Sequence, residues 1–160
     1  MKQIKVNFHT HTTASFDGYN SYKALYKYAK RCELEVIAIT DHDTIDGALG
    51  FVKWLKRHGK IDLDVIIGEE VTCLDGTHII GLYLEKHIEQ DSPLKVIQKI
   101  KEQNGLVYFP HPSRKDGIMR SEAYQQAIWL GDAFEVFNGK INYAYNKEAF
   151  AEFEKYKHMI

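Results

Sequence analysis

The sequence predicts one α/β domain over residues 1–160, with a mostly parallel sheet covered by helices. Three observations predict this class. Short apolar runs alternate with longer stretches of helical spacing, which is the order of elements that builds parallel sheets. The 160 residues are enough to bury one core, and no linker, repeat or low-complexity tract divides them. Periodicity alone leaves open whether the sheet is an open doubly wound one or a (β/α) barrel.

Six short runs are expected to form the strands. In chain order they are residues 4–11, 36–39, 65–67, 79–84, 106–109 and 133–137. Asp75-Gly76 lies between the third and fourth runs and is typical of a hairpin turn. That pair is therefore expected to be antiparallel, whereas the βαβ rhythm elsewhere favours parallel neighbours.

Four stretches have the apolar spacing of helices. The first begins after Ser21, and the second begins after Asp46, which is expected to cap it. Ser92 is predicted to cap the third helix, with Pro93 at its first position. Residues 143–158 are expected to form the last helix.

Composition and charge exclude several function classes. Lys and Arg number 21 against 22 Asp and Glu, so no global basic surface exists to hold a long nucleic acid or an anionic membrane. No apolar run approaches the roughly 20 residues that span a bilayer, and no membrane partner is expected. Two cysteines cannot form a disulfide framework, and the first polar cluster, at His9, leaves no room for a signal peptide. We therefore expect a cytoplasmic protein with reduced thiols.

Histidine and acidic side chains gather where the expected strands begin or end. His9 and His11 close the first run, and a spacing of two puts both imidazoles on the same face of an extended chain. Asp17 lies in the loop that follows. The other side chains at strand ends or starts are His42, Glu69, Glu70, His78 and His111. Because parallel sheets carry their sites at the carboxyl ends of the strands, these side chains are expected to converge.

This mixture of donors favours a metal site. Imidazole and carboxylate ligands suit Zn²⁺, Mn²⁺ or Fe ions, and a carboxylate such as Glu70 can bridge two of them. A structural tetrathiolate zinc is excluded by the scarcity of cysteine, and Cys73 is expected to be a small buried residue. A site with several ions activates water and neutralises a phosphoryl group, so hydrolysis of a phosphate ester is the expected reaction.

Other polar residues have simpler interpretations. Three histidines lack an acidic or histidine partner at ligand spacing and are expected on the surface: His58, His87 and His158. Three acidic residues are expected either to orient an imidazole or to be solvated loop charges: Asp41, Asp43 and Glu69.

Six short motifs carry a family resemblance. They are His9-Thr10-His11-Thr12, Asp17-Gly18, Thr40-Asp41-His42-Asp43, Gly68-Glu69-Glu70-Val71, His78-Ile79-Ile80-Gly81 and Pro110-His111-Pro112. In this order and at these separations they resemble the polymerase and histidinol phosphatase (PHP) family of metal-dependent phosphoesterases. The resemblance covers residues 1–138, and residues 135–138 are similar to a further segment common in that family.

The resemblance implies a distorted (β/α)7 barrel with up to three divalent ions at the carboxyl ends of its strands. The implied ligands are His9, His11 and Glu70 for one ion, Asp17 and His42 for a second, and Glu70, His78 and His111 for a third. Arg114 follows the His-Pro motif and is the candidate contact for substrate phosphate, the alternative being an ordinary exposed arginine.

The sequence departs from the family pattern at its end. Family members carry a later Ser-Asp-x-His segment, and nothing after Asn138 matches it, so the last strands of the barrel are expected to be missing. Three explanations stay open. The chain is a fragment, a partner chain or another copy completes the barrel, or a short form keeps an incomplete site.

The implied function is a phosphoesterase that hydrolyses phosphate esters of small metabolites or nucleotides through a metal-activated water. One alternative is a catalytically weak metal-binding module or fragment that acts with a partner chain. Another is a 5′–3′ exonuclease on short single strands, because trimming an end needs only a few basic contacts.

Overall fold

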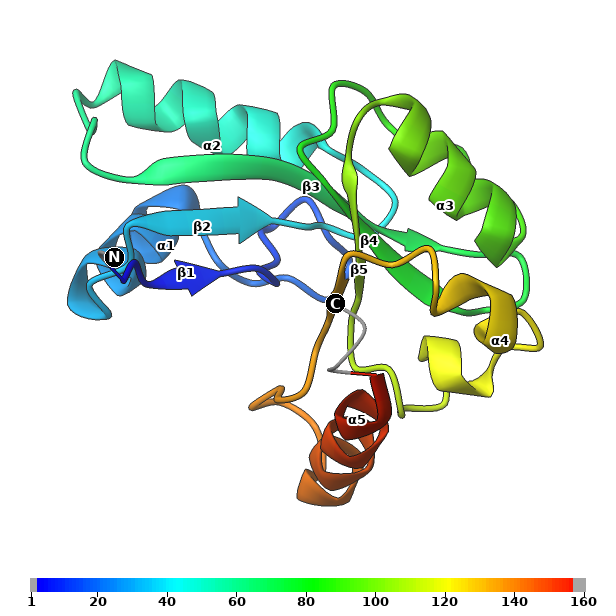
Figure 1. The fold of residues 1–160 in the computed structure, drawn as a ribbon. Helices are drawn as coiled ribbons and strands as arrows, with labels where there is room; N and C mark the ends of the chain where they lie inside the picture. The colour runs from blue at the N-terminus through cyan, green and yellow to red at the C-terminus, as the bar shows by residue number, and fades with distance from the viewer. Residues whose placement is uncertain (1–2, 157–160) are drawn as a thin grey trace.

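Six strands form one curled sheet in the computed structural model, which describes residues 3–156 (Figure 1). In chain order the strands are β1 (Val6–Asn7), β2 (Val36–Ile39), β3 (Asp64–Thr72), β4 (His78–Leu82), β5 (Leu106–Phe109) and β6 (Ala133–Phe134). Their order in the sheet is the same. All neighbours are parallel except at β4, which is antiparallel to both β3 and β5. The α/β class and the hairpin at residues 75–76 are therefore confirmed.

Helices cover one face of this half-barrel. The helices that pack on the sheet are α1 (Tyr22–Arg31), α2 (Asp46–Arg57) and α3 (Pro93–Glu102). After β5 come a 3-10 turn (Ile118–Arg120) and the short α4 (Tyr124–Ala127), and after β6 comes α5 (Tyr143–Tyr156). Figure 1 shows α2 and α3 on the outside of the curl and α5 below the end of β5.

Both faces of the central strands are apolar. On β2, Ile37 and Ile39 pack with α1 and α2, whereas Ala38 faces the other side of the sheet. There Ala38 joins a smaller cluster that includes Ile66 and Ile80. Strands that are buried on both faces are typical of parallel sheets.

The first strand is shorter than the run of residues 4–11 predicts. The strand ends at Asn7, the fourth residue of the run, where the amide of His9 donates to the side-chain oxygen of Asn7 at 3.1 Å. Beyond that point the carbonyl of Thr10 accepts from the amide of Thr40 at 2.9 Å. His9 and His11 therefore lie in a loop that is fastened to the end of β2, not in a strand.

Helix starts follow the sequence prediction at α1 and depart from it at α2. The hydroxyl of Ser21 caps α1 and accepts from the amide of Ala24 at 3.3 Å. At α2 the prediction of an Asp46 cap is wrong, because Ile45 holds the cap position and Asp46 is the first helical residue. The Asp46 amide instead donates to the hydroxyl of Thr44 at 3.1 Å.

The third and last helices follow the prediction more closely. Ser92 holds the cap position of α3 with Pro93 at the first helical position, although its hydroxyl makes no cap hydrogen bond. The last predicted helix, residues 143–158, is found as α5, and residues 157 and 158 lie outside the described part of the chain.

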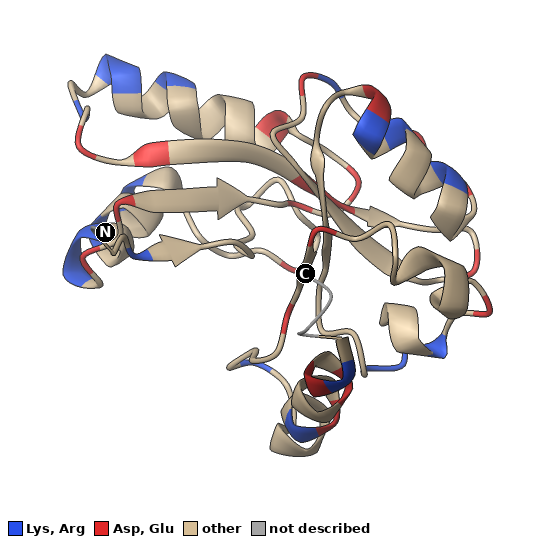
Figure 2. Cartoon of the chain, in the orientation of Figure 1, with Lys and Arg blue, Asp and Glu red and all other residues tan. Residues whose placement is uncertain are grey.

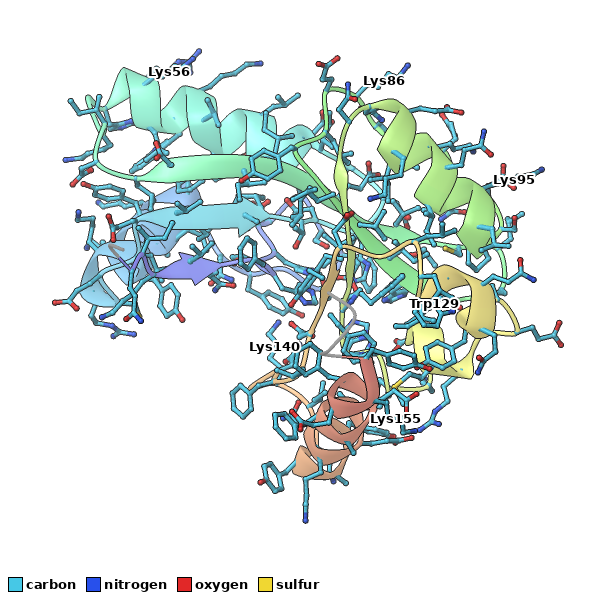
Figure 3. The ribbon with its side chains drawn as sticks, viewed as in Figure 1. Lys56, Lys86, Lys95, Trp129, Lys140 and Lys155 are labelled. Atoms are coloured by element: carbon cyan, nitrogen blue, oxygen red, sulfur yellow. The ribbon has the colours of Figure 1, made fainter. Side chains whose placement is uncertain are left out.

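Basic residues are spread over separate helices and do not gather in one patch (Figure 2). Figure 3 shows Lys56, Lys86 and Lys95 pointing away from the sheet, whereas Lys140 lies on the loop between β6 and α5. Within residues 3–156, no helix combines the length and the apolar character that crossing a membrane requires.

Candidate metal centre

The predicted ligands meet at one edge of the sheet. The strands β1, β2, β3 and β5 all end at this edge, and β4 begins there because it runs the opposite way. The pairing of Thr72 with His78 places the start of β4 beside the end of β3. His42 bridges to Glu70 just beyond the end of β2. The structure therefore shows these side chains meeting at the edge that strand direction predicts.

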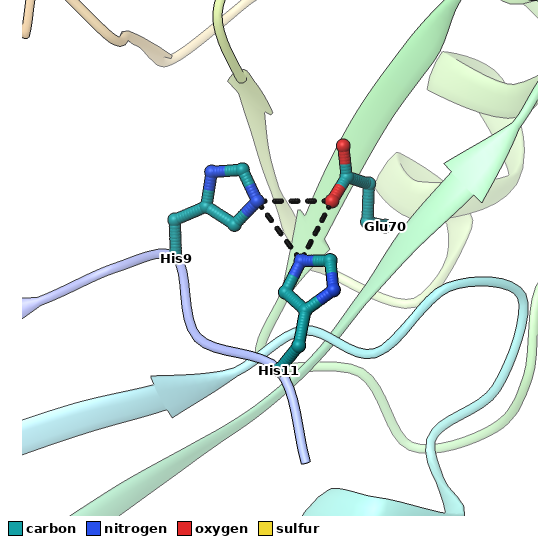
Figure 4. A group of neighbouring side chains, drawn as sticks. All are labelled: His9, His11 and Glu70. Carbon is teal, nitrogen blue, oxygen red and sulfur yellow. Dashed lines mark hydrogen bonds and ion pairs between the residues drawn. The ribbon is translucent and has the colours of Figure 1, made fainter. Parts of the chain in front are cut away.

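Two imidazole nitrogens and one oxygen of Glu70 form a tight triangle of donor atoms (Figure 4). The Nε2 atoms of His9 and His11 are 3.0 Å apart, and each lies 2.9 Å from Glu70 Oε2. Glu70 is 1% exposed, so its carboxylate is largely shielded from bulk water. Ligand atoms about 2.1 Å from a common ion and at right angles to one another are about 3 Å apart, so this triangle fits a divalent cation.

A second group surrounds the other oxygen of the same carboxylate. His78 Nδ1 lies 3.0 Å and His111 Nε2 lies 2.9 Å from Glu70 Oε1. Each oxygen of Glu70 therefore faces two imidazole nitrogens. A carboxylate that is shared in this way can bridge two ions, which is the arrangement of multi-metal hydrolases.

Asp17 and His42 are near each other but form a looser group. His42 Nε2 lies 3.8 Å from Asp17 Oδ2 and 3.7 Å from Glu70 Oε2. The other oxygen of Asp17 lies closer, at 2.9 Å, to Nδ1 of His11. Asp17 can therefore orient the imidazole of His11 as well as join His42 around an ion.

The charges at this edge depend on one another. Burial lowers the pKa of His9, but Glu70 and Glu135 outweigh burial and raise the pKa to about 10. Burial raises the pKa of Glu70, and the surrounding imidazoles outweigh it and hold that pKa well below its usual range. At His42, burial dominates and lowers the pKa.

The arrangement of these side chains suits a bound divalent cation better than it suits hydrogen bonds among the side chains themselves. Only one of two facing imidazole nitrogens can donate to the other, yet Nε2 of His9 and Nε2 of His11 lie 3.0 Å apart and each also lies 2.9 Å from the same Glu70 oxygen. Among the described residues, Nδ1 of His42 and Nδ1 of His111 are buried and lack a hydrogen-bond partner. Imidazole and carboxylate donors at these distances are the ligands that Zn²⁺, Mn²⁺ and Fe ions prefer.

Two acidic residues at the site have contacts that sequence reasoning missed. Asp116 Oδ1 is 3.6 Å from Nδ1 of His111, and Asp116 shares a possible cation site with His78 and His111. Its loop carries no periodic signal that marks it. Glu135 follows β6 and faces Nδ1 of His9 at 3.2 Å. The similarity of residues 135–138 to a family segment marked this stretch of the sequence, but it did not predict the contact of Glu135 with His9.

Arg114 lies beside the cluster, half-buried, and its guanidinium is paired with the Asp116 carboxylate through Nε at 2.6 Å and through a second nitrogen. It is therefore not an ordinary exposed arginine.

The remaining acidic residues near the site are structural supports. Asp41 is fully buried and accepts from the amide and hydroxyl of Thr12, at 2.6 and 2.8 Å. Asp43 accepts from the amide of Thr72 at 2.7 Å. Both side chains hold loops that carry ligands. Neither carboxylate is a solvated loop charge, and both accept hydrogen bonds from backbone or hydroxyl groups.

Glu69 and the three histidines outside the cluster need one correction. Glu69 is 0% exposed, which excludes a solvated charge, and it pairs with Nδ1 of His87 at 2.6 Å. The prediction that His87 has no acidic partner is therefore wrong, although its side chain is 40% exposed. His58 stacks on Trp54 at the surface, as expected. His158 lies outside the described residues.

A cavity of about 720 Å³ opens beside the cluster. His9, His11, His42, Glu70 and His111 form part of its wall. Arg114 and Lys140 supply positive charge, and Phe8 and Phe137 supply apolar surface. The carboxylates of Asp17, Glu70 and Glu135 lie on the same wall, so the cavity combines charges of both signs with apolar surface.

Three comparisons relate the chain to known proteins. A family model described as PHP domain matches residues 7–160, which extends past the residues 1–138 that carry the sequence motifs. The uncharacterized protein MJ1587 of Methanocaldococcus jannaschii is 38% identical over 120 residues, which are 68% of each chain. A crystal structure from Bifidobacterium adolescentis, whose name proposes a metal-dependent phosphoesterase, matches with a TM-score of 0.71 and 15% identity. That match covers 98% of this chain and 85% of the other, and it supports the fold alone.

Proposed function

Because the chain belongs to the PHP domain family, we propose that this metal-dependent hydrolase cleaves phosphate esters of small metabolites or nucleotides. The observation that carries the proposal is Glu70, whose two buried oxygens each face two imidazole nitrogens within 3.0 Å. Such a donor set suits a pair of divalent ions, and paired ions serve phosphoryl transfer.

The residues that would hold the ions are those of the three donor groups. They are His9, His11 and Glu70; Glu70, His78 and His111; and, more loosely, Asp17 and His42. We propose Zn²⁺, Mn²⁺ or Fe ions, up to three in number. When bound, divalent ions lower the pKa of water and neutralise charge on a phosphoryl group.

The chain's own residues would bind and orient the substrate. Arg114 lies at the cavity wall, and a guanidinium can bind a phosphate through two nitrogens. Asp116 now occupies that face of Arg114, so a phosphate would exchange one anionic partner for another. Lys140 adds a second cation to the same wall. With two such cations, the cavity favours a small anion over a long polymer.

The test combines metal analysis with turnover of chosen substrates. The purified protein is loaded with Mn²⁺ or Zn²⁺, its metal content is measured, and hydrolysis of p-nitrophenyl phosphate, nucleoside monophosphates and a short single-stranded oligonucleotide is followed. We expect bound metal and release of phosphate from the small esters, abolished by a chelator. Bound metal without turnover would favour the metal-binding module. Cleavage of the oligonucleotide alone would favour the exonuclease.

Completion of the site by another chain is a separate proposal. In the described residues, β1 and β6 are two-residue strands at the two ends of the sheet, and each has one neighbour. Turnover that rises more steeply than protein concentration would support a partner copy, and strict proportionality would oppose it.

A further inference from the structure

Glu135 is a buried carboxylate with four partners. It is 8% exposed and lies just past the end of β6. Its Oε1 is 3.2 Å from Nδ1 of His9 and accepts from the hydroxyl of Tyr108 at 3.1 Å. Its Oε2 accepts from the amide of His111 at 2.6 Å and from the side-chain amide of Asn138 at 3.1 Å. Both oxygens are therefore fully used inside the protein.

The contact with His9 determines which nitrogen of that ring is free. A carboxylate only accepts hydrogen bonds, so the Nδ1 atom that faces Glu135 carries the proton. The opposite nitrogen, Nε2, is then the one that can give up its proton and offer a lone pair to an ion beside Glu70 and His11. Glu135 touches the side of the ring that points away from this group, so it cannot share an ion with Nε2 of His9.

The contact with His111 acts on the backbone. His111 has a φ of +29°, a conformation that residues other than glycine seldom adopt. The short hydrogen bond from its amide to Glu135 stabilises that conformation and aims the imidazole at the second oxygen of Glu70. One carboxylate thus holds one histidine from each of the two main donor groups.

The segment that carries Glu135 is fastened to α5. The side chain of Asn146, which is buried on that helix, accepts from the amide of Asn138 at 2.9 Å and donates to its carbonyl at 3.0 Å. Asn138 in turn donates to Glu135. The position of the carboxylate is therefore fixed from outside the sheet, independently of the histidines that it contacts.

From these contacts we propose that Glu135 is a positioning residue, which selects the Nδ1-protonated form of His9 and holds His111, so that both rings present Nε2 at the Glu70 cluster. The inference rests on the proposed metal site. Partners of this kind fix the tautomer and the orientation of a ligating histidine, and their loss costs about 10- to 100-fold in metal affinity.

The test is Glu135→Gln, which keeps the shape and changes one acceptor to a donor. The backbone amide of His111 only donates, and Asn138 presents its donating Nδ2 because its Oδ1 already accepts from the amide of Lys140 at 2.9 Å. The new carbonyl oxygen is therefore expected to face these two donors. The new NH₂ group then faces Nδ1 of His9 and requires that nitrogen to be unprotonated. We expect a 10- to 100-fold weaker affinity for Zn²⁺, measured by calorimetry in competition with a chelator.

A second readout separates positioning from general damage. In the zinc-loaded wild-type protein, nitrogen NMR of the histidine rings is expected to find Nδ1 of His9 protonated, and in Glu135→Gln this signal is expected to be lost. Glu135→Asp keeps an acceptor and is expected to bind Zn²⁺ more tightly than Glu135→Gln. The matched control is Asp132→Asn, a carboxylate three residues earlier that accepts from the amide of Val107 and is expected to leave affinity unchanged.

The outcomes distinguish this inference from the function it rests on. Wild-type protein that binds no Zn²⁺ would overturn the proposed metal site. Wild-type binding with equal affinity in Glu135→Gln, or a protonated Nδ1 retained in that variant, would overturn the role of Glu135 alone. If Glu135→Gln does not fold, Glu135→Asp tests the proposal. We then expect Glu135→Asp to bind Zn²⁺ more weakly than the wild type while Nδ1 of His9 stays protonated, and wild-type affinity would overturn the role of Glu135.

Discussion

Glu69 and Glu70 are neighbours on β3, both buried and both in contact with histidine, yet they do different things. Because side chains alternate along a strand, they point to opposite faces of the sheet. Glu69 accepts from the amide of Ile88 at 3.0 Å and pairs with one imidazole, that of His87. Glu70 meets four imidazoles. Glu69 fastens a loop through two hydrogen-bond partners, whereas Glu70 has two imidazole nitrogens at each oxygen and is placed to hold cations.

The largest expected effect comes from removing the bridging charge. Glu70→Gln takes one anionic oxygen from each of the two main donor groups, so we expect metal content to fall below one ion per chain. Turnover of the phosphate ester is expected to fall about a hundredfold or more, in line with the loss of paired ions. Elemental analysis and a chromogenic assay measure the two effects. Unchanged metal content in Glu70→Gln would contradict the assignment of Glu70, as opposed to Glu69, as the metal-binding carboxylate.

Loss of a single imidazole should be milder. His111→Ala removes a donor from one oxygen of Glu70 only, so we expect partial loss of metal and a decrease in turnover of about 10- to 100-fold. His58→Ala is the matched control, because His58 stacks on Trp54 at the surface and is expected to change neither quantity. Equal metal content in the two variants would reject the ligand assignment of His111.

The metal-free cluster should make stability depend on pH. Burial lowers the pKa of His9, but the two glutamates raise it to about 10, above the ordinary value of 6.5. A raised histidine pKa stabilises the fold fully below the unfolded value, and that stabilisation is lost as the pH rises through the folded value. We expect the unfolding free energy of chelator-treated protein to fall between pH 6.5 and 10, by at most about 1.4 kcal/mol per pH unit. Urea unfolding across this range measures it, and a flat profile would contradict the charge pairing.

The smallest effect is expected on the other face of β3. Glu69→Gln leaves the amide of Ile88 or the ring of His87 with a poorer partner, which should cost about 1–3 kcal/mol in unfolding free energy. Metal content should stay at the wild-type value because Glu69 touches none of the donor groups. Chemical denaturation and elemental analysis of the same sample test both statements, and a loss of metal would mean that the two faces are not independent.

Much of the fold and of the cluster could be predicted because the relevant signals are local. The ends of apolar runs and the Asp75-Gly76 turn give strand direction, and strand direction decides which edge a histidine reaches. His78 is the sharpest case, because it belongs to the edge only if its strand runs backwards. The family resemblance added the choice of barrel, which periodicity had left open.

What could not be predicted depends on contacts between distant residues. Burial of Glu69 depends on the loop of His87 and Ile88, which folds back over the outer face of β3. Asp116 depends on a turn with no periodic pattern. At α2, Ile45 holds the cap position and the amide of Asp46 donates to the hydroxyl of Thr44. Neither spacing nor composition records such partners.

The hydrogen bond between His9 and Glu135 joins residues 126 positions apart, and Glu135 is itself held through Asn138 by α5. Closing a long loop has an entropic cost, so we expect this contact to form after those between near neighbours in the chain. During synthesis, His9 and His11 leave the ribosome long before Glu135, the residue that orients His9. The incomplete chain would then bind a metal ion only weakly during most of its synthesis. Tight binding of an ion would begin when folding is complete.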